Sequence, residues 1–198
     1  MNDRSVKKKP YFTTVEILFL SSMIGLDFVY GMVAGPLLSA SGILEVIRID
    51  MVIPVVMMLI TRLLVDKFGT LVIYEIVWGI LAMLARPASM GGIPAFMKLV
   101  PLMAYGLILD SCMELFRDRL YARLLLAGVI GGFVNQFVFM GIRVMFGMPW
   151  STAVKVFLGI QILTNILVNV IAVHLAFLVW RGVERSGWSQ RLRAWRTS

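Results

Sequence analysis

The chain has 198 residues, of which 60% are hydrophobic and only 15% are charged, and its mean hydropathy is +0.89. This composition excludes an ordinary soluble domain, in which about a quarter of the residues are charged. The formal net charge of +8 does not indicate a nucleic-acid binder, because the basic residues gather at the chain ends and in short stretches between apolar segments. The sequence therefore predicts an all-α integral membrane protein.

Apolar segments follow one another along the chain with short polar connections. A helix needs about 20 apolar residues to cross about 30 Å of hydrocarbon, so the chain has room for about six spans and no second domain. The first apolar segment is too long for the core of a signal peptide, and we expect it to remain as a helix that ends at Gly35-Pro36. The single membrane domain comprises a basic N-terminus (1–10), a bundle (11–180) and a basic amphipathic tail (181–198), with predicted spans at 11–34, 51–64 (extended at its start from 43), 70–85, 95–109, 120–146 and 152–180.

Lys and Arg are distributed unequally between the two sides of this predicted bundle. One side holds 14 of the 19, and the other holds only Arg48, Arg86, Lys98, Arg143 and Lys155. The positive-inside rule places the richer side in the cytoplasm, so both termini are predicted to be cytoplasmic and the number of spans even. We expect six spans; four are possible if two of the shorter segments are re-entrant.

The sequence lacks the familiar motifs of catalysis and metal binding. Cys112 is the only cysteine and His174 the only histidine, which excludes an intrachain disulfide and clusters of Cys or His ligands. Neither a G-x-x-x-x-G-K-[ST] phosphate loop nor an H-E-x-x-H motif occurs. We therefore expect no enzyme activity, no cofactor and no metal, and any energy source must be a gradient or another subunit.

Glu75 is the most informative polar residue at membrane depth, where a charge usually faces the bundle interior. It lies in the third predicted span, and Trp78 follows three positions later on the same helix face. An acidic and an aromatic group in this arrangement can hold a cationic or aromatic ring. The structural alternative is an internal ion pair of Glu75 with Lys98 or Arg143, and the sequence leaves both readings open.

Basic residues on the sparsely charged side form a second group of candidates. Lys98 and Arg143 have apolar flanks, and together with Arg48, Arg86 and Lys155 they can form an external mouth that attracts an anionic or polar solute. Contact with lipid headgroups is the alternative, and for Arg48 and Lys155 it is equally plausible.

Amide side chains in the fifth and sixth predicted spans add a third group. Gln161, Asn165 and Asn169 are spaced four residues apart and share one helix face. Asn135, Gln161 and Asn165 lie toward the outer half of the bundle and are candidates for binding a ligand. Hydrogen bonding between helices is the alternative, and we expect it to account for Asn169.

The stretch from about Ile49 to Asp110 resembles the substrate-binding S component of an energy-coupling factor (ECF) vitamin transporter. It contains a span, a short basic turn with Gly69, a span bearing Glu75, a Gly/Pro-rich loop and a span ending in a Tyr-Gly stretch. Around Tyr74-Glu75-Ile76 it is similar to the branch for thiamine or its hydroxymethylpyrimidine precursor. The resemblance covers about a third of the chain. It implies a multi-pass subunit of a prokaryotic plasma membrane that captures a small water-soluble vitamin outside the cell.

The same resemblance implies partners and site residues. An S component docks on a transmembrane coupling subunit driven by two ATPase subunits, and its toppling in the membrane releases the substrate inside. Docking uses small residues of the first helix, usually Ala-x-x-x-Ala, and the corresponding positions here, Ser21 and Gly25, depart from alanine. The alternatives are a structural or assembly subunit of a larger membrane complex and, less favoured because the chain halves show no repeat, a standalone secondary transporter. The implied ligand contacts are Glu75, Trp78, Lys98, Asn135, Arg143, Trp150 and Gln161.

Overall fold

A computed structural model describes residues 10–40, 48–85 and 94–187 of the chain. All secondary structure within these ranges is helical, which confirms the predicted all-α class. The predicted N-terminal segment 1–9, the Gly-rich loop with Arg86 and the end of the basic tail lie outside the described residues. In chain order the helices and 3-10 turns are α1 (Thr14–Ala40), η2 (Ile49–Met51), α2 (Val52–Val65), α3 (Thr70–Ala85), η3 (Ala95–Lys98), α4 (Leu99–Leu115), α5 (Leu120–Met145), α6 (Trp150–Phe157) and α7 (Ile160–Glu184).

Four stretches of the described chain are long and apolar enough to cross a membrane. By contrast, α2 and α3 have 14 and 16 residues, and at 1.5 Å per residue each is shorter than about 30 Å of hydrocarbon. The chain is therefore a membrane protein by length and composition of its helices, while six full spans remain a prediction. The four stretches are Thr14–Leu38, Phe96–Leu115, Leu120–Met145 and Trp150–Glu184.

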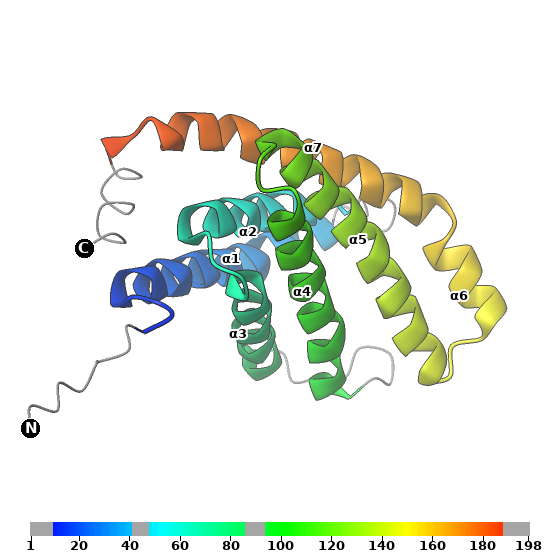
Figure 1. Cartoon of the computed structure of the whole chain (residues 1–198). Coiled ribbons are helices and arrows are strands. Elements are labelled where there is room, and N and C mark those ends of the chain that lie inside the picture. The colour runs from blue at the N-terminus through cyan, green and yellow to red at the C-terminus, as the bar shows by residue number, and fades with distance from the viewer. Residues whose placement is uncertain (1–9, 41–47, 86–93, 188–198) are drawn as a thin grey trace, which may run out of the picture.

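The longer helices form two groups of three that pack on each other. Helix α4 lies between α3 and α5, and α2 lies between α1 and α7. Helix α1 contacts α3 at one edge and α7 contacts α5 at the other, so the six helices enclose a common core. Figure 1 shows α3, α4 and α5 side by side, running across the direction of α1, α2 and α7, with the short α6 beside the far ends of α5 and α7.

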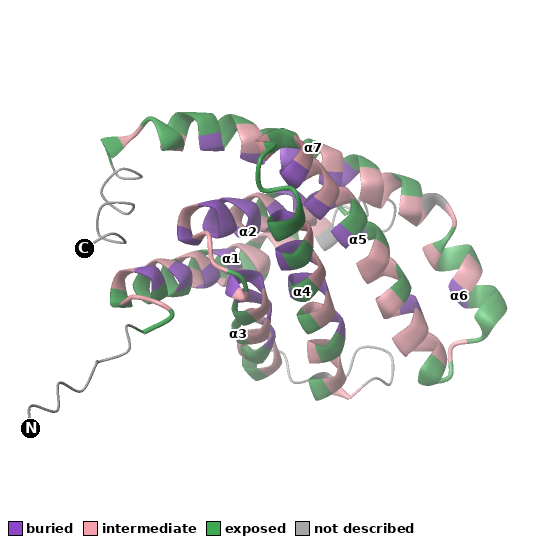
Figure 2. Cartoon of the chain, in the orientation of Figure 1, coloured by how far each residue is buried: buried purple, intermediate pink, exposed green. Residues whose placement is uncertain are grey.

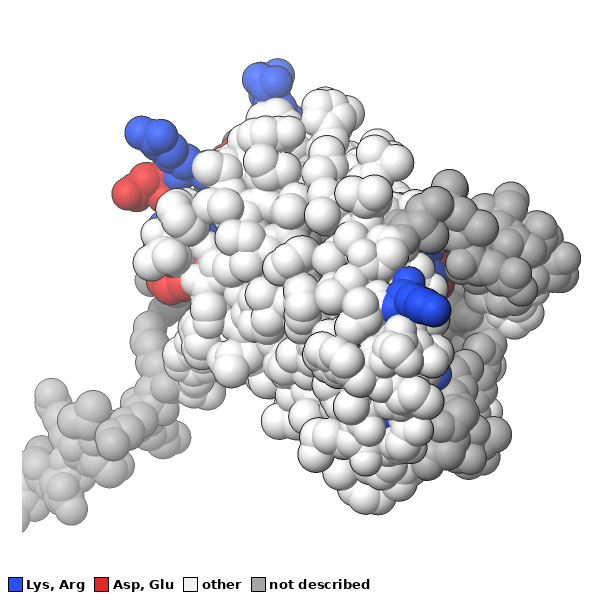
Figure 3. Space-filling view, turned by 90° about the vertical axis from the view of Figure 1, so that its right-hand side faces the viewer, with Lys and Arg blue, Asp and Glu red and all other residues white. Residues whose placement is uncertain are grey.

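The residues that are buried lie where the helices pack on each other. Helix α2 is the most enclosed element, and buried residues cover most of its length (Figure 2). Its Leu59, together with Leu71 of α3, Leu109 of α4 and Leu124 of α5, is fully removed from solvent. Large apolar side chains elsewhere point outward, such as Leu84 at 75% exposure and Met145 at 80%. The face in Figure 3 carries few charged side chains between broad uncharged areas, as a lipid-facing surface requires.

Helices α3 and α4 approach each other closely because of Gly106. A Cβ atom on Gly106 would lie 2.6 Å from the carbonyl oxygen of Leu71 and 2.9 Å from the Cα of Val72. Only glycine allows backbones to approach this closely, as at other helix contacts in membranes. The start of α3 is thereby set against the middle of α4, one turn before Asp110.

Three predicted helix boundaries are wrong. Helix α1 does not end at Gly35-Pro36 but continues to Ala40, because a proline near a helix end removes only one of the last backbone hydrogen bonds. Helix α4 continues past the predicted end at residue 109 to Leu115, since Asp110, the next residue, is paired with Arg62 inside the bundle. The sixth predicted span, 152–180, breaks at Leu158 and Gly159 into α6 and α7.

The bounds of the second, third and fifth predicted spans agree with the structure. Helix α3 coincides with the prediction, and α2 and α5 begin and end within one residue of it. The predicted extension from residue 43 lies mostly outside the described residues, and its last part forms η2. These segments are strongly apolar, and their ends coincide with turn residues such as Asp66 and Gly69, both of which adopt a positive φ.

Candidate binding site

Two faces of α3 carry the polar residues of the bundle interior. Tyr74 and Trp78 are one turn apart and face α1, where the Tyr74 hydroxyl reaches Asp27 and the Trp78 ring lies near Gly31. Glu75 and Gly79 are also one turn apart and face α4, because a Cβ on Gly79 would meet Leu99 and Leu102. Helix α3 therefore presents an acid toward α4 and two polar aromatic residues toward α1.

Asp27 of α1 is the polar partner of this face. Its side chain is buried at 3% exposure, and its Oδ2 accepts a hydrogen bond of 2.9 Å from the Tyr74 hydroxyl. Its Oδ1 is buried and has no hydrogen-bond partner. Sequence reasoning missed Asp27, although the rule that singled out Glu75 applies equally to an aspartate in the middle of an apolar segment.

Glu75 is buried at 6% exposure and forms no hydrogen bond or ion pair within the described chain. The charge that acts on it is that of Asp27, and it acts in turn on the phenol of Tyr105, which is buried on α4. Neither Lys98 nor Arg143 forms an ion pair with Glu75, so the structural alternative of an internal ion pair is wrong. Two carboxyl groups thus lie in the bundle interior without a base beside them.

Trp78 is a further residue of α3 with an unpaired polar atom. The indole ring is half-buried and packs on the core, and its Nε1 is buried without an acceptor. A buried polar group without a partner costs free energy unless something else satisfies it. Asp27 Oδ1 and Trp78 Nε1 are therefore unsatisfied on the side of α3 that faces α1, and Glu75, on the side that faces α4, has no hydrogen bond to a described residue. We call Asp27, Tyr74, Glu75, Trp78 and Tyr105 the acidic cluster.

The other predicted ligand contacts lie apart from the acidic cluster. Asn135 Oδ1 and Arg143 Nε are buried without hydrogen-bond partners, both on α5. Trp150 begins α6 and is 61% exposed, which removes it from the bundle interior. Gln161 is half-buried in the first turn of α7, and Lys98 is half-buried at the end of η3. No hydrogen bond links any two members of the predicted set in the described ranges, so one joint site is not formed by direct contacts.

Amide side chains join α5 to α7. Asn165 donates a hydrogen bond of 3.0 Å to Gln136 Oε1, and Asn169 donates to both the backbone oxygen and the Oδ1 of Asn165. A Cβ on Gly132 would lie 2.5 Å from Asn169 Nδ2, so glycine is needed there for the helices to approach. Asn165 thus connects the two helices, contrary to its predicted role as a ligand contact. Both hydrogen bonds of Asn169 stay within α7, and its Oδ1 has no partner among the described residues, so the bond between helices that we expected for Asn169 is not formed.

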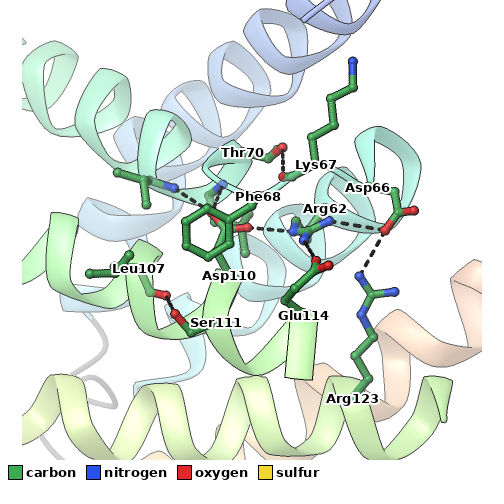
Figure 4. A network of polar contacts seen from close by, with 12 residues as sticks. Arg62, Asp66, Lys67, Phe68, Thr70, Leu107, Asp110, Ser111, Glu114 and Arg123 are labelled. Carbon is green, nitrogen blue, oxygen red and sulfur yellow. Dashed lines mark hydrogen bonds and ion pairs between the residues drawn. The ribbon is translucent and has the colours of Figure 1, made fainter. Parts of the chain in front are cut away.

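A network of charges lies where α2, α3, α4 and α5 meet (Figure 4). Arg62 is fully buried, and its Nε donates to Asp110 Oδ1 at 2.6 Å, while its Nη2 donates to Glu114 at 2.9 Å. Asp110 Oδ2 accepts hydrogen bonds from the backbone N–H groups of Leu71 at 2.9 Å and Val72 at 3.3 Å. Asp110 therefore caps the start of α3 from another helix, which satisfies two amides that α3 itself leaves unpaired.

The outer part of this network centres on Asp66. Asp66 ends α2 in the left-handed conformation and receives hydrogen bonds from Arg117 at 2.9 Å and Arg123 at 3.2 Å. Burial by itself raises the pKa of Asp66, but the two guanidinium groups outweigh burial and hold the pKa below its ordinary value of 3.8. The network contains as many acids as bases, so it holds four helices together and leaves no charge for a ligand.

Lys67 fixes the start of α1 beside this network. Its Nζ lies 2.5 Å from Glu16 Oε2, and Glu16 and Thr13 bond each other's backbone N–H groups in a capping box. Arg62, Lys67, Arg117 and Arg123, all assigned to the basic side by the sequence, are thus gathered in one region.

No protein-family model matches the sequence, and no curated protein or solved structure is significantly similar to it. The acidic cluster differs from the charge and amide networks because, apart from the hydrogen bond between Tyr74 and Asp27, its buried polar groups are not paired with described residues. Such a site can bind a small molecule or ion that supplies the missing positive charge and hydrogen-bond acceptor. In the described residues no group of three or more His, Cys, Asp or Glu side chains could hold a metal ion.

Proposed function

We propose that this protein is the substrate-capturing membrane subunit of an ATP-driven importer of the ECF type, which takes up a small water-soluble vitamin or precursor. One observation carries the proposal: the Glu75 carboxyl group is buried on the side of α3 that faces α4, and it forms no hydrogen bond or ion pair with any described residue. A residue that merely holds helices together would be paired, as Arg62 and Asp110 are.

The outward face of α1 supports the docking part of this proposal. Ser21 is exposed, and a Cβ on Gly25 would meet nothing within 4 Å. No helix of this chain occupies the small-residue face in the described structure, so it is open to lipid or to a helix of a coupling subunit. The proposed partners remain a transmembrane coupling subunit and two ATPase subunits in a prokaryotic plasma membrane.

The second candidate is a structural or assembly subunit of a larger membrane complex. The observations that favour it are the charge network and the amide hydrogen bond between α5 and α7, because the polar groups of both connect helices. Under this alternative, the unpaired groups of the acidic cluster would contact a partner protein rather than a small molecule.

Thermal unfolding of the purified protein with a panel of vitamins and precursors separates the two candidates. We expect one compound to raise the melting temperature, and Glu75→Gln to abolish this response while leaving the protein folded. Glu114→Gln is the matched control, because Glu114 is 43% exposed and lies in the charge network. Arg143→Ala tests whether the guanidinium group on α5, whose buried Nε has no hydrogen-bond partner among the described residues, also contacts the ligand.

Native mass spectrometry of the protein extracted from its own membrane provides a second readout. The proposal predicts a copurified small molecule together with a coupling subunit and two ATPase subunits. Absence of any response across the panel, combined with association with proteins other than ATPases, would favour the assembly subunit.

A further inference from the structure

The acidic cluster contains two carboxyl groups, Asp27 on α1 and Glu75 on α3, and the charge of Asp27 acts on Glu75. We infer that the substrate of this subunit is a monovalent cation, held between Asp27 and Glu75 in exchange for a proton. This inference rests on the proposed function and extends it by naming the charge of the ligand. The sequence alone left a cation, a zwitterion and an anion open.

The geometry leaves one carboxyl oxygen of Asp27 free for a ligand. The Tyr74 hydroxyl holds Asp27 Oδ2 at 2.9 Å, which orients the carboxyl group and leaves the buried Oδ1 without a partner. Trp78, one turn beyond Tyr74 on the same face of α3, adds an aromatic ring on the side that faces α1. Carboxylates together with an indole ring are a chemistry that proteins use to bind organic cations.

The charge balance selects a monovalent cation. Two neighbouring carboxylates buried away from water cannot both be ionised without a positive charge, so the empty pair keeps a proton. When the cation binds, that proton leaves to solvent and the cation takes its place, so the total charge of the site is unchanged. An anion would add repulsion, and a divalent metal ion would need more oxygen ligands than the described cluster offers.

Other titratable groups around the pair do not supply the balancing charge. Tyr30 of α1 lies within electrostatic range of Asp27 and of Asp50, and Tyr105 of α4 lies within range of Glu75. Asp50 is paired with Arg48 through two hydrogen bonds of 3.0 Å. On α2, the basic residue is Arg62, whose guanidinium group is taken up by the charge network. The exchangeable proton therefore belongs to Asp27 and Glu75.

The test uses three probes that share one ring and differ in charge: 1-methylnicotinamide (cation), nicotinamide (neutral) and nicotinate (anion). The full chain, purified in detergent and weakly buffered, is titrated with each probe and with sodium chloride, and released protons are followed with a pH indicator. We expect 1-methylnicotinamide to raise the melting temperature and to release about one proton per cation bound. The neutral and anionic probes should do neither.

Substitutions locate the exchange. Asp27→Asn and Glu75→Gln should each weaken binding at least about tenfold and abolish proton release, since each removes one of the two charges. Both substitutions remove a buried carboxyl group, so we expect the variants to remain folded. The matched control is Asp118→Asn, which removes a carboxylate from the exposed turn between α4 and α5 and should leave binding and proton release unchanged.

Each remaining outcome decides against part of the inference. Proton release by sodium alone would overturn the assignment of the cation as substrate and would identify the pair as an inorganic ion site. If a neutral or anionic vitamin stabilises the protein and Asp27→Asn does not alter that response, the cationic substrate is wrong while the proposed function stands. If no probe and no vitamin has any effect, both are wrong.

Discussion

Replacement of Arg62 by methionine tests whether the charge network holds the bundle together. Arg62 and Asp110 are both fully buried, with Nε and Oδ1 2.6 Å apart. Arg62→Met leaves the Asp110 carboxylate buried with only the amides of Leu71 and Val72 as donors. We expect the free energy of unfolding to fall by about 3–5 kcal/mol, as for other buried ion pairs that lose one partner. Coulomb attraction at about 4 Å and an effective dielectric constant of about 20 has a similar size, about 4 kcal/mol.

A graded series distinguishes this effect from a general loss of packing. Glu114→Gln should cost only about 0–1 kcal/mol, because the Glu114 side chain is 43% exposed and solvent screens its pairing with Arg62. The double variant Arg62→Met/Asp110→Asn removes both buried charges and keeps a side-chain oxygen for the start of α3. It should therefore be more stable than Arg62→Met alone, with a coupling energy of roughly 1–3 kcal/mol.

Equilibrium unfolding in mixed detergent micelles at pH 7, followed by tryptophan fluorescence and circular dichroism, measures these differences. The Gly141→Ala variant reports the scatter of the method, because a Cβ at Gly141 meets nothing within 4 Å. A loss below about 1 kcal/mol for Arg62→Met, or a coupling energy of zero with Asp110→Asn, would refute the view that this pair connects the helices.

Three further predictions concern helix contacts and pH. Gly106→Ala should lower stability by about 1–3 kcal/mol in the same unfolding assay, because its Cβ would lie 2.6 Å from the Leu71 carbonyl oxygen; stability equal to that of Gly141→Ala would contradict the close contact. Gln136→Ala should cost about 0.6 kcal/mol by removing the acceptor of Asn165, and a larger loss would point to an additional role. Asp66→Asn keeps the left-handed turn but removes the charge, so the variant should melt at a lower temperature than the wild type from neutral pH down to about pH 4. Below about pH 4 this difference should shrink, because the wild-type carboxylate is protonated there. A difference that is unchanged at pH 3 would show that the charge is not its cause.

The apolar composition and the spacing of the polar stretches determined the class of this protein and most of its helices. The bounds of α3 agree with the prediction, and those of α2 and α5 agree within one residue, because each is a continuous apolar segment that ends at a turn or at charged residues. Glu75 was also recognisable, since a charge inside an apolar segment is costly and therefore informative. These properties depend on neighbours in the sequence alone.

Only the tertiary structure decided which polar residues from distant segments of the chain pair with each other. The fourth span was predicted to end at residue 109, but Asp110 is fully buried because Arg62, 48 residues away, neutralises it and the start of α3 donates its free amides. The charge of Asp27 reaches Glu75 only because α1 packs against α3. Whether a polar residue connects helices or stays free for a ligand depends on what the fold places beside it, and no local pattern encodes that neighbour.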